Sequence, residues 1–149
     1  MNMYKCMLKI LSGKLHWLIL YMYVCLLAYV SDHVITFDGT EFPENIKAIL
    51  ISTPFPPSGP RCFTFQYRIC GPAYTASVLI GYLFNDIRYF GNILWTKSRM
   101  TPSCSGWSEG SVNIQSMPID YFVAIKAEKG VNPGKVFLDN FNFKHGNCM

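Results

Sequence analysis

Apolar and polar side chains alternate along parts of the chain that follow residue 31. In the clearest stretch, from Cys62 to Ile69, every second residue is aromatic or branched and apolar: Phe63, Phe65, Tyr67 and Ile69. Because successive side chains of a strand point to opposite faces of its sheet, these four residues would share one face. The stretch therefore predicts a strand whose aromatic face packs against a core.

Short runs of branched and aromatic residues recur through the rest of this region, separated by Gly, Pro, Asn and Ser. The other predicted strands cover residues 46–52, 75–84, 92–97, 107–114, 121–128 and 135–143. Nowhere do apolar residues keep a 3.6-residue period for long. This spacing is typical of a sandwich rather than of alternating β and α units, so the sequence predicts an all-β, jelly-roll-like β-sandwich.

The first 31 residues follow a different pattern. Lysines at positions 5, 9 and 14 are the only charged residues before Asp32, and an uncharged apolar run extends from Trp17 to Val30. A basic start followed by such a run is typical of a secretory signal peptide. The run is shorter than the roughly 20 residues of a comfortable membrane span, which favours cleavage. The cleavage pattern around Leu26 and Ala28 is weak, so an uncleaved signal-anchor helix is the alternative.

Both alternatives divide the chain into a hydrophobic signal peptide or anchor helix at 1–31 and a domain at 32–149. Because the lysines lie only before the apolar run, the positive-inside rule places the domain outside the cytoplasm. We therefore expect an extracellular protein, secreted or membrane-anchored, that contacts the membrane only if the first segment is not cleaved. A buried core helix is a third interpretation of this segment, but the lysines and the terminal position fit targeting better.

The net charge of +4 comes mostly from this first segment. Without its three lysines, ten basic residues stand against nine acidic ones. Domains that bind nucleic acids usually carry a clear excess of positive charge. The balanced charge of residues 32–149 therefore argues against a nucleic-acid partner.

Four of the six cysteines, at positions 62, 70, 104 and 148, lie in the predicted domain. An even number of cysteines in an oxidising compartment predicts two disulfides. The cysteines form no C-x-x-C pair, which argues against a zinc site. The domain has only two histidines, His33 and His145, near its ends, so no nucleophile with a partnered base can be assembled. The sequence predicts no enzyme activity, no metal and no cofactor.

Three stretches carry a recognisable set of motifs. Residues 62–67 (CFTFQY) are similar to the pattern Cys-Leu-x-Phe-x-Tyr, and residues 93–95 (ILW) are similar to a Leu-Trp strand. Residues 136–141 (VFLDNF), with Gly146 and Cys148, are similar to a closing Ala-Leu-Asp-Asp-Ile, Gly and Cys. In this order the motifs resemble the MAM domain, an extracellular module of meprins, neuropilins and receptor-type tyrosine phosphatases.

Two weaker similarities lie upstream. Residues 32–34 (DHV) resemble the family's Asp-His-Thr, and residues 48–54 (AILISTP) resemble its Ala-x-Leu-x-Ser-Pro. The family's opening Cys-x-Phe-Glu and Cys-Gly-Trp motifs are absent, so we expect a MAM-like domain at 32–149 that lacks its first strands. A sandwich without those strands would leave strand edges open for pairing with another chain.

The resemblance implies a non-catalytic module that mediates protein contacts in adhesion or in the assembly of ectoenzymes and receptors. The expected partner is an extracellular protein, and a second copy of the chain is one option. The family's disulfide would join Cys62 to Cys148, which in the chain-entropy model stabilises the fold by ~4 to 5 kcal/mol. Cys70 and Cys104 are not part of the usual family pattern, and we assign them to each other by elimination.

Asp139 is the nearest approach to acid chemistry in the sequence. Strict alternation would place it on the same strand face as Phe137, Phe141 and Phe143, where an unpaired carboxylate is costly. Hydrogen bonds from backbone amides or from an arginine are the favoured explanation. A calcium-type site is the weaker alternative, because no Asp and Asn cluster with EF-hand spacing accompanies it. Asp139 is therefore only a weak metal candidate.

Trp95 and Trp107 suggest an alternative function, a secreted lectin-like domain that binds glycans through surface aromatic rings. Packing in the core is the favoured role for both tryptophans. Their burial separates the two interpretations, because buried tryptophans cannot form a sugar-stacking platform.

Overall fold

The computed structural model describes residues 4–6, 17–22, 28–31, 34–38, 47–71, 74–99, 103–104, 106–129 and 134–149. The described residues form β-strands and contain no helix, which confirms the predicted all-β class. The strands are β1 (Tyr4–Cys6), β2 (Trp17–Met22), β3 (Ala28–Ser31), β4 (Val34–Asp38), β5 (Lys47–Ser52), β6 (Arg61–Cys70), β7 (Tyr74–Phe84), β8 (Ile87–Arg99), β9 (Ser108–Ile114), β10 (Tyr121–Glu128) and β11 (Lys135–His145).

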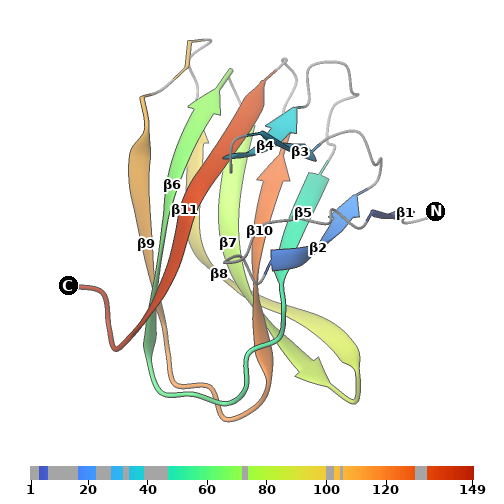
Figure 1. Cartoon of the computed structure of the whole chain (residues 1–149), viewed down its shortest axis with the longest axis vertical. Coiled ribbons are helices and arrows are strands. Elements are labelled where there is room, and N and C mark those ends of the chain that lie inside the picture. The colour runs from blue at the N-terminus through green and yellow to red at the C-terminus, as the bar shows by residue number, and fades with distance from the viewer. Residues whose placement is uncertain are drawn as a thin grey trace.

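The strands form two antiparallel sheets that pack face to face (Figure 1). The six-stranded sheet has the order β1-β2-β5-β10-β7-β8, and the five-stranded sheet has the order β3-β4-β11-β6-β9. Most neighbours within a sheet are not consecutive in sequence, so the chain crosses repeatedly from one sheet to the other. This arrangement is a jelly-roll-like sandwich, as predicted.

The core lies between the sheets, and alternate residues of the central strands supply it. In β6, the four side chains Phe63, Phe65, Tyr67 and Ile69 are buried, as their alternation predicted. From the opposite sheet, β10 contributes Tyr121, Val123, Ile125 and Ala127. The ring centroid of Phe63 lies 4.5 Å from that of Phe143 and 5.2 Å from that of Phe65. The predicted aromatic face of β6 therefore forms the centre of the core.

A two-residue turn joins β7 to β8. Asn85 and Asp86 have φ angles of 50° and 61°, and the residues that flank them, Phe84 and Ile87, pair with each other. Two successive residues in the left-handed region are typical of a type I′ hairpin turn, which Asn and Asp tolerate better than most residues. The hairpin extends β8 to 13 residues, so the strand begins five residues before the predicted start at 92.

Two glycines lie directly opposite buried phenylalanines. Gly110 in β9 pairs with Phe65 in β6, and Gly81 in β7 pairs with Phe122 in β10. A Cβ atom at either glycine would lie well inside van der Waals contact with the opposite ring. Each ring therefore occupies the space that a side chain at the glycine would need.

We expect Gly110→Ala to lower the free energy of unfolding by about 1 to 3 kcal/mol, because the added methyl group would displace the Phe65 ring in a closely packed core. Urea unfolding, followed by tryptophan fluorescence, measures the change. Gly106→Ala is the control, since among the described residues no atom beyond its chain neighbours lies within 4 Å of the position of its Cβ. Equal unfolding midpoints for the two variants would contradict this account of Gly110.

The described residues of the first segment are strands, whereas we predicted a signal or anchor helix over residues 1–31. β2 pairs with β5, with Ile19 opposite Ile51, and β3 pairs with β4. Branched and aromatic residues favour strands as well as membrane helices, and the backbone of β5 offers an edge for pairing. Much of the segment lies outside the described residues, and its cleavage or anchoring stays a prediction. In the part of the chain that the structure describes, no helix is long and apolar enough to cross a membrane.

Candidate interaction surface

Two disulfides hold the two ends of β6. Cys62 is bonded to Cys148 with 4.8 Å between their Cα atoms, and Cys70 is bonded to Cys104 with 3.9 Å between theirs. The backbone N–H of Cys148 also donates a hydrogen bond to Asn113 Oδ1 at 2.6 Å. The structure therefore contains both expected pairs, the one implied by the family resemblance and the one assigned by elimination.

A β-bulge in β11 changes the surroundings predicted for Asp139. The register between β11 and β6 shifts just after this residue, and Asn140 has a φ of 52°. One extra residue reverses the alternation of side chains along a strand. Phe141 and Phe143 consequently pack against the core, whereas Asp139 shares the outer face of the sheet with Phe137. The prediction that all four residues share a face was wrong.

A hydrogen bond at the bulge satisfies the Asp139 carboxylate. Its Oδ1 atom accepts a hydrogen bond from the backbone N–H of Asn140 at 2.7 Å. The side-chain amide of Asn140 in turn donates to Gln66 Oε1 on β6 at 2.8 Å. Among the described residues, no group of three or more His, Cys, Asp or Glu could hold a metal ion. These contacts give Asp139 a role in fixing the bulge.

The two tryptophans differ in burial. Trp95 in β8 packs against the core, with its ring edge-on to Phe65 and Tyr67 at centroid distances of 5.0 Å. Trp107, just before β9, is 46% exposed. Trp95 therefore has the core role that we favoured, whereas Trp107 leaves one aromatic ring on the surface.

A row of apolar residues crosses the outer face of the six-stranded sheet. We call it the outer apolar row: Ile51 in β5, Ala124 in β10, Leu79 in β7 and Ile93 in β8, each paired in register with the next. Ile51 and Ala124 are fully buried, whereas Ile93 is 53% exposed. Phe90 lies on the same face, with its ring edge-on to the buried ring of Phe122 at a centroid distance of 5.5 Å. The row is therefore buried at β5 and β10 and exposed to solvent at β8.

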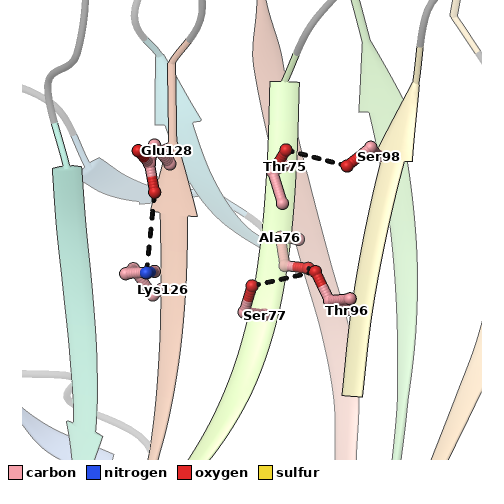
Figure 2. A network of polar contacts seen from close by, with 7 residues as sticks. All are labelled: Thr75, Ala76, Ser77, Thr96, Ser98, Lys126 and Glu128. Carbon is pink, nitrogen blue, oxygen red and sulfur yellow. Dashed lines mark hydrogen bonds and ion pairs between the residues drawn. The ribbon is translucent and has the colours of Figure 1, made fainter. Parts of the chain in front are cut away.

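The other end of this face is polar, as Figure 2 shows. Its residues are Thr75, Ser77, Thr96, Ser98, Lys126 and Glu128. Two hydroxyl pairs join β7 to β8 at 2.9 and 3.1 Å, and an ion pair on β10 spans 3.5 Å. These groups satisfy one another, so the polar end offers less than the apolar end for binding a partner.

Six large apolar side chains of the β7–β8 hairpin are exposed. They are Phe84, Ile87, Tyr89, Phe90, Ile93 and Leu94. The turn of this hairpin lies at the lower right of Figure 1, apart from the other strands. The register with β7 places Phe90 and Ile93 on the outer face of the hairpin and Ile87 and Tyr89 on the other face, so apolar side chains, which mark interaction sites when many are exposed, lie on both faces. Our sequence analysis missed this surface, although an Asn-Asp pair between apolar runs could have indicated the hairpin.

The protein is a disulfide-linked β-sandwich module, because two antiparallel sheets pack face to face and disulfides hold both ends of the central strand β6. The chain belongs to the MAM domain family (meprin/A5/mu), whose family model matches residues 29–149. This match confirms the resemblance seen in the sequence. No curated protein matches the chain in a sequence search.

Solved structures with a similar fold include two cleaved adhesin domains of Lys-gingipain from Porphyromonas gingivalis W83. The K3 domain is 17% identical, with a TM-score of 0.60, and the alignment covers 76% of this chain and 74% of that one. The K1 domain is 15% identical, with a TM-score of 0.59 and coverage of 87% and 83%. The N-terminal cellulose-binding domain of β-1,4-glucanase C from Cellulomonas fimi is 9% identical, with a TM-score of 0.52 and coverage of 82% and 84%. At these identities the likeness is one of fold alone.

Proposed function

We propose that this chain is a non-catalytic extracellular interaction module whose partner is a protein. Its two disulfides support an extracellular location, because cytosolic thiols are kept reduced. Membership of the MAM family supports the same location and the same kind of role. The predicted signal peptide or anchor at residues 1–31 would deliver the domain to the cell exterior.

The exposed β7–β8 hairpin carries this proposal. Its apolar side chains lie on two paired strands, so the backbone that carries them is already ordered before a partner covers them. Aromatic and aliphatic groups of this kind supply most of the binding energy in protein interfaces. A partner that covers the hairpin would remove from water the largest group of exposed apolar side chains among the described residues.

Cell-surface binding tests the proposal. We expect the labelled, secreted chain to bind saturably to cultured cells, and mild trypsin treatment of the cells to abolish binding while glycosidase treatment leaves it intact. Ile87→Ser, on the hairpin, should weaken binding about 10-fold or more through the loss of one anchoring side chain. Ile119→Ser is the matched control, since this isoleucine is also exposed but lies outside the hairpin. Binding that survives trypsin and Ile87→Ser would refute a protein partner at this surface.

Glycan binding is the second candidate, favoured by the exposed ring of Trp107. An exposed aromatic ring can stack on the apolar face of a sugar. The similar fold of a cellulose-binding domain is compatible with this alternative. If it is correct, a glycan array gives specific signals that Trp107→Ala removes, and glycosidase treatment rather than trypsin abolishes binding to cells.

A further inference from the structure

The exposed ring of Trp107 belongs to a segment that is anchored on both sides. On its N-terminal side, Cys104 is bonded to Cys70, and the guanidinium of Arg99 donates two hydrogen bonds to Ser103, at 2.7 and 3.0 Å. On its C-terminal side, β9 begins at the next residue. The ring is therefore exposed although its backbone is held in place, and a ligand that covers it loses little affinity to ordering of the chain.

The pairing of β6 with β9 places Trp107 beside Arg68. Ser108 lies opposite Tyr67, so the same register continued by one residue sets Trp107 against Arg68. Arg68 alternates with the buried residues of β6 and lies on the outer face of the five-stranded sheet. Trp107 precedes the exposed Glu109 by two residues, so alternation gives both of them this same face.

Arg68 also lies against a second aromatic residue. Phe137 of β11 is opposite it in register, and the guanidinium carbon of Arg68 is 5.9 Å from the centroid of the Phe137 ring. Arg68 Nε has no hydrogen-bond partner among the described residues, so contact with the ring, rather than a hydrogen bond at Nε, positions the guanidinium. An arginine between two aromatic residues therefore crosses this end of the face.

The next row across the same face balances the charge of Arg68. Glu109, Gln66 and Asp139 lie opposite one another in register on β9, β6 and β11. Asp139 and Gln66 are engaged at the bulge, where Asn140 donates a hydrogen bond to each. Glu109 is exposed, on the strand that Trp107 precedes. Its carboxylate is therefore the hydrogen-bond acceptor nearest in sequence to the Trp107 ring.

These groups have the chemistry that recognises a neutral sugar. An indole ring stacks on the apolar face of a sugar, and hydroxyl groups both donate to a carboxylate and accept from a guanidinium. Same-face positions lie about 6.8 Å apart along a strand and about 4.8 Å apart between strands, which puts Trp107, Arg68 and Glu109 within reach of one sugar ring. An acidic sugar would meet the carboxylates of this face, so the charge balance favours an uncharged one.

We propose that Trp107, Arg68 and Glu109 bind one hexose residue of a neutral glycan on the outer face of the five-stranded sheet. The β7–β8 hairpin belongs to the other sheet, so this glycan site is separate from the protein-binding surface. One stacked ring and a few hydrogen bonds bind weakly, and the hairpin still governs the binding of the chain to cells. The inference goes beyond the proposed protein-binding function, and it rests on the second candidate function, to which it gives a site and a ligand class.

A glycan array tests the ligand class. The secreted full chain is displayed on beads, because multivalent display makes weak binding measurable. The array carries neutral oligosaccharides of glucose, galactose and mannose together with their sialylated and sulfated counterparts. We expect signals from neutral oligosaccharides, and Trp107→Ala should lower them about 10-fold or more. Tyr89→Ala is the matched control, since it removes a ring that is 50% exposed on the hairpin, and it should leave the signals unchanged.

Titration of the strongest neutral oligosaccharide, followed by tryptophan fluorescence, tests the other two residues. Stacking on Trp107 should change the emission of wild type saturably and leave that of Trp107→Ala unchanged. Arg68→Gln and Glu109→Gln should each weaken binding about 5-fold or more through the loss of a hydrogen bond to a charged group. Glu109→Gln should also raise the array signals of the sialylated counterparts, an effect that a merely structural role would not produce. Urea unfolding establishes that each variant is folded.

The possible outcomes separate this site from the functions proposed above. Signals confined to acidic glycans, or neutral-glycan signals that Trp107→Ala leaves intact, would overturn the site while glycan binding itself stands. The absence of signal from every glycan would overturn the site and the second candidate function together. Trypsin-sensitive binding to cells that Ile87→Ser weakens would in either case leave the protein-binding function standing.

Discussion

Replacing both Cys62 and Cys148 by alanine is expected to lower the free energy of unfolding by about 4 to 5 kcal/mol. The bond closes a loop with a sequence separation of 86 residues, and in the chain-entropy model the stabilisation grows with the logarithm of loop length. Domains of this size are stable by only about 5 to 15 kcal/mol in total. The double variant should therefore lose from about a quarter to nearly all of its stability, which differential scanning calorimetry would detect as a large fall in Tm.

The second disulfide provides the comparison. Cys70 and Cys104 have a sequence separation of 34 residues, so the same model gives about 4 kcal/mol for this bond, slightly less than for the longer loop. Replacing both with alanine should destabilise the domain by the smaller amount. If removing this disulfide lowered the free energy of unfolding by more than removing Cys62–Cys148, native contacts rather than loop length would decide which disulfide stabilises the domain more.

Phe63→Ala should lower the free energy of unfolding by about 3 to 5 kcal/mol. The side chain is fully buried and stacks on Phe65 and Phe143, so its removal leaves a cavity that rigid neighbouring rings cannot fill. Urea unfolding with a fixed m-value gives the difference. Phe84→Ala makes the same exchange at a residue that is 59% exposed, and the two sheets do not enclose it.

That control should change stability by less than about 0.5 kcal/mol. Similar losses for Phe63→Ala and Phe84→Ala would mean that the exposed hairpin contributes to the core of the folded domain. Such a result would also weaken the assignment of the hairpin as a binding surface.

β6 could be predicted almost completely from the sequence. Its aromatic residues alternate without interruption, and a central strand with one buried face requires this pattern. β10 also matches its predicted span of residues 121–128, although both of its faces carry buried residues. Strong local patterns therefore identified the strands that build the core.

The position of Asp139 could not be predicted, because it depends on a bulge. Asn140 tolerates the left-handed conformation that the bulge requires, yet an asparagine in a strand pattern does not by itself indicate where the register shifts. The shift is set by how β11 pairs with β6, which is a contact between segments far apart in the sequence. Alternation beyond such a point assigns every side chain to the wrong face.

The exposed apolar residues of the β7–β8 hairpin could not be predicted from the sequence for a related reason. β8 carries two register shifts against β7, so its apolar residues do not follow a period of two. The sequence indicated a strand only around Trp95, whose side chain packs on the core. The exposure of the remaining apolar residues depends on β8 being an edge strand, and the order of strands in a sheet is a property of the whole fold.

A pulling force applied at the C-terminal end would reach β6 through the Cys62–Cys148 bond before it loaded the hydrogen bonds of β11. The segment between the two cysteines, which have a sequence separation of 86, could not be drawn out while that bond is intact. At about 3.4 Å for each extended residue, roughly 290 Å of length would be withheld. A module placed between two cells would therefore transmit tension as a short, stiff link, and reduction of this single bond would make it extensible.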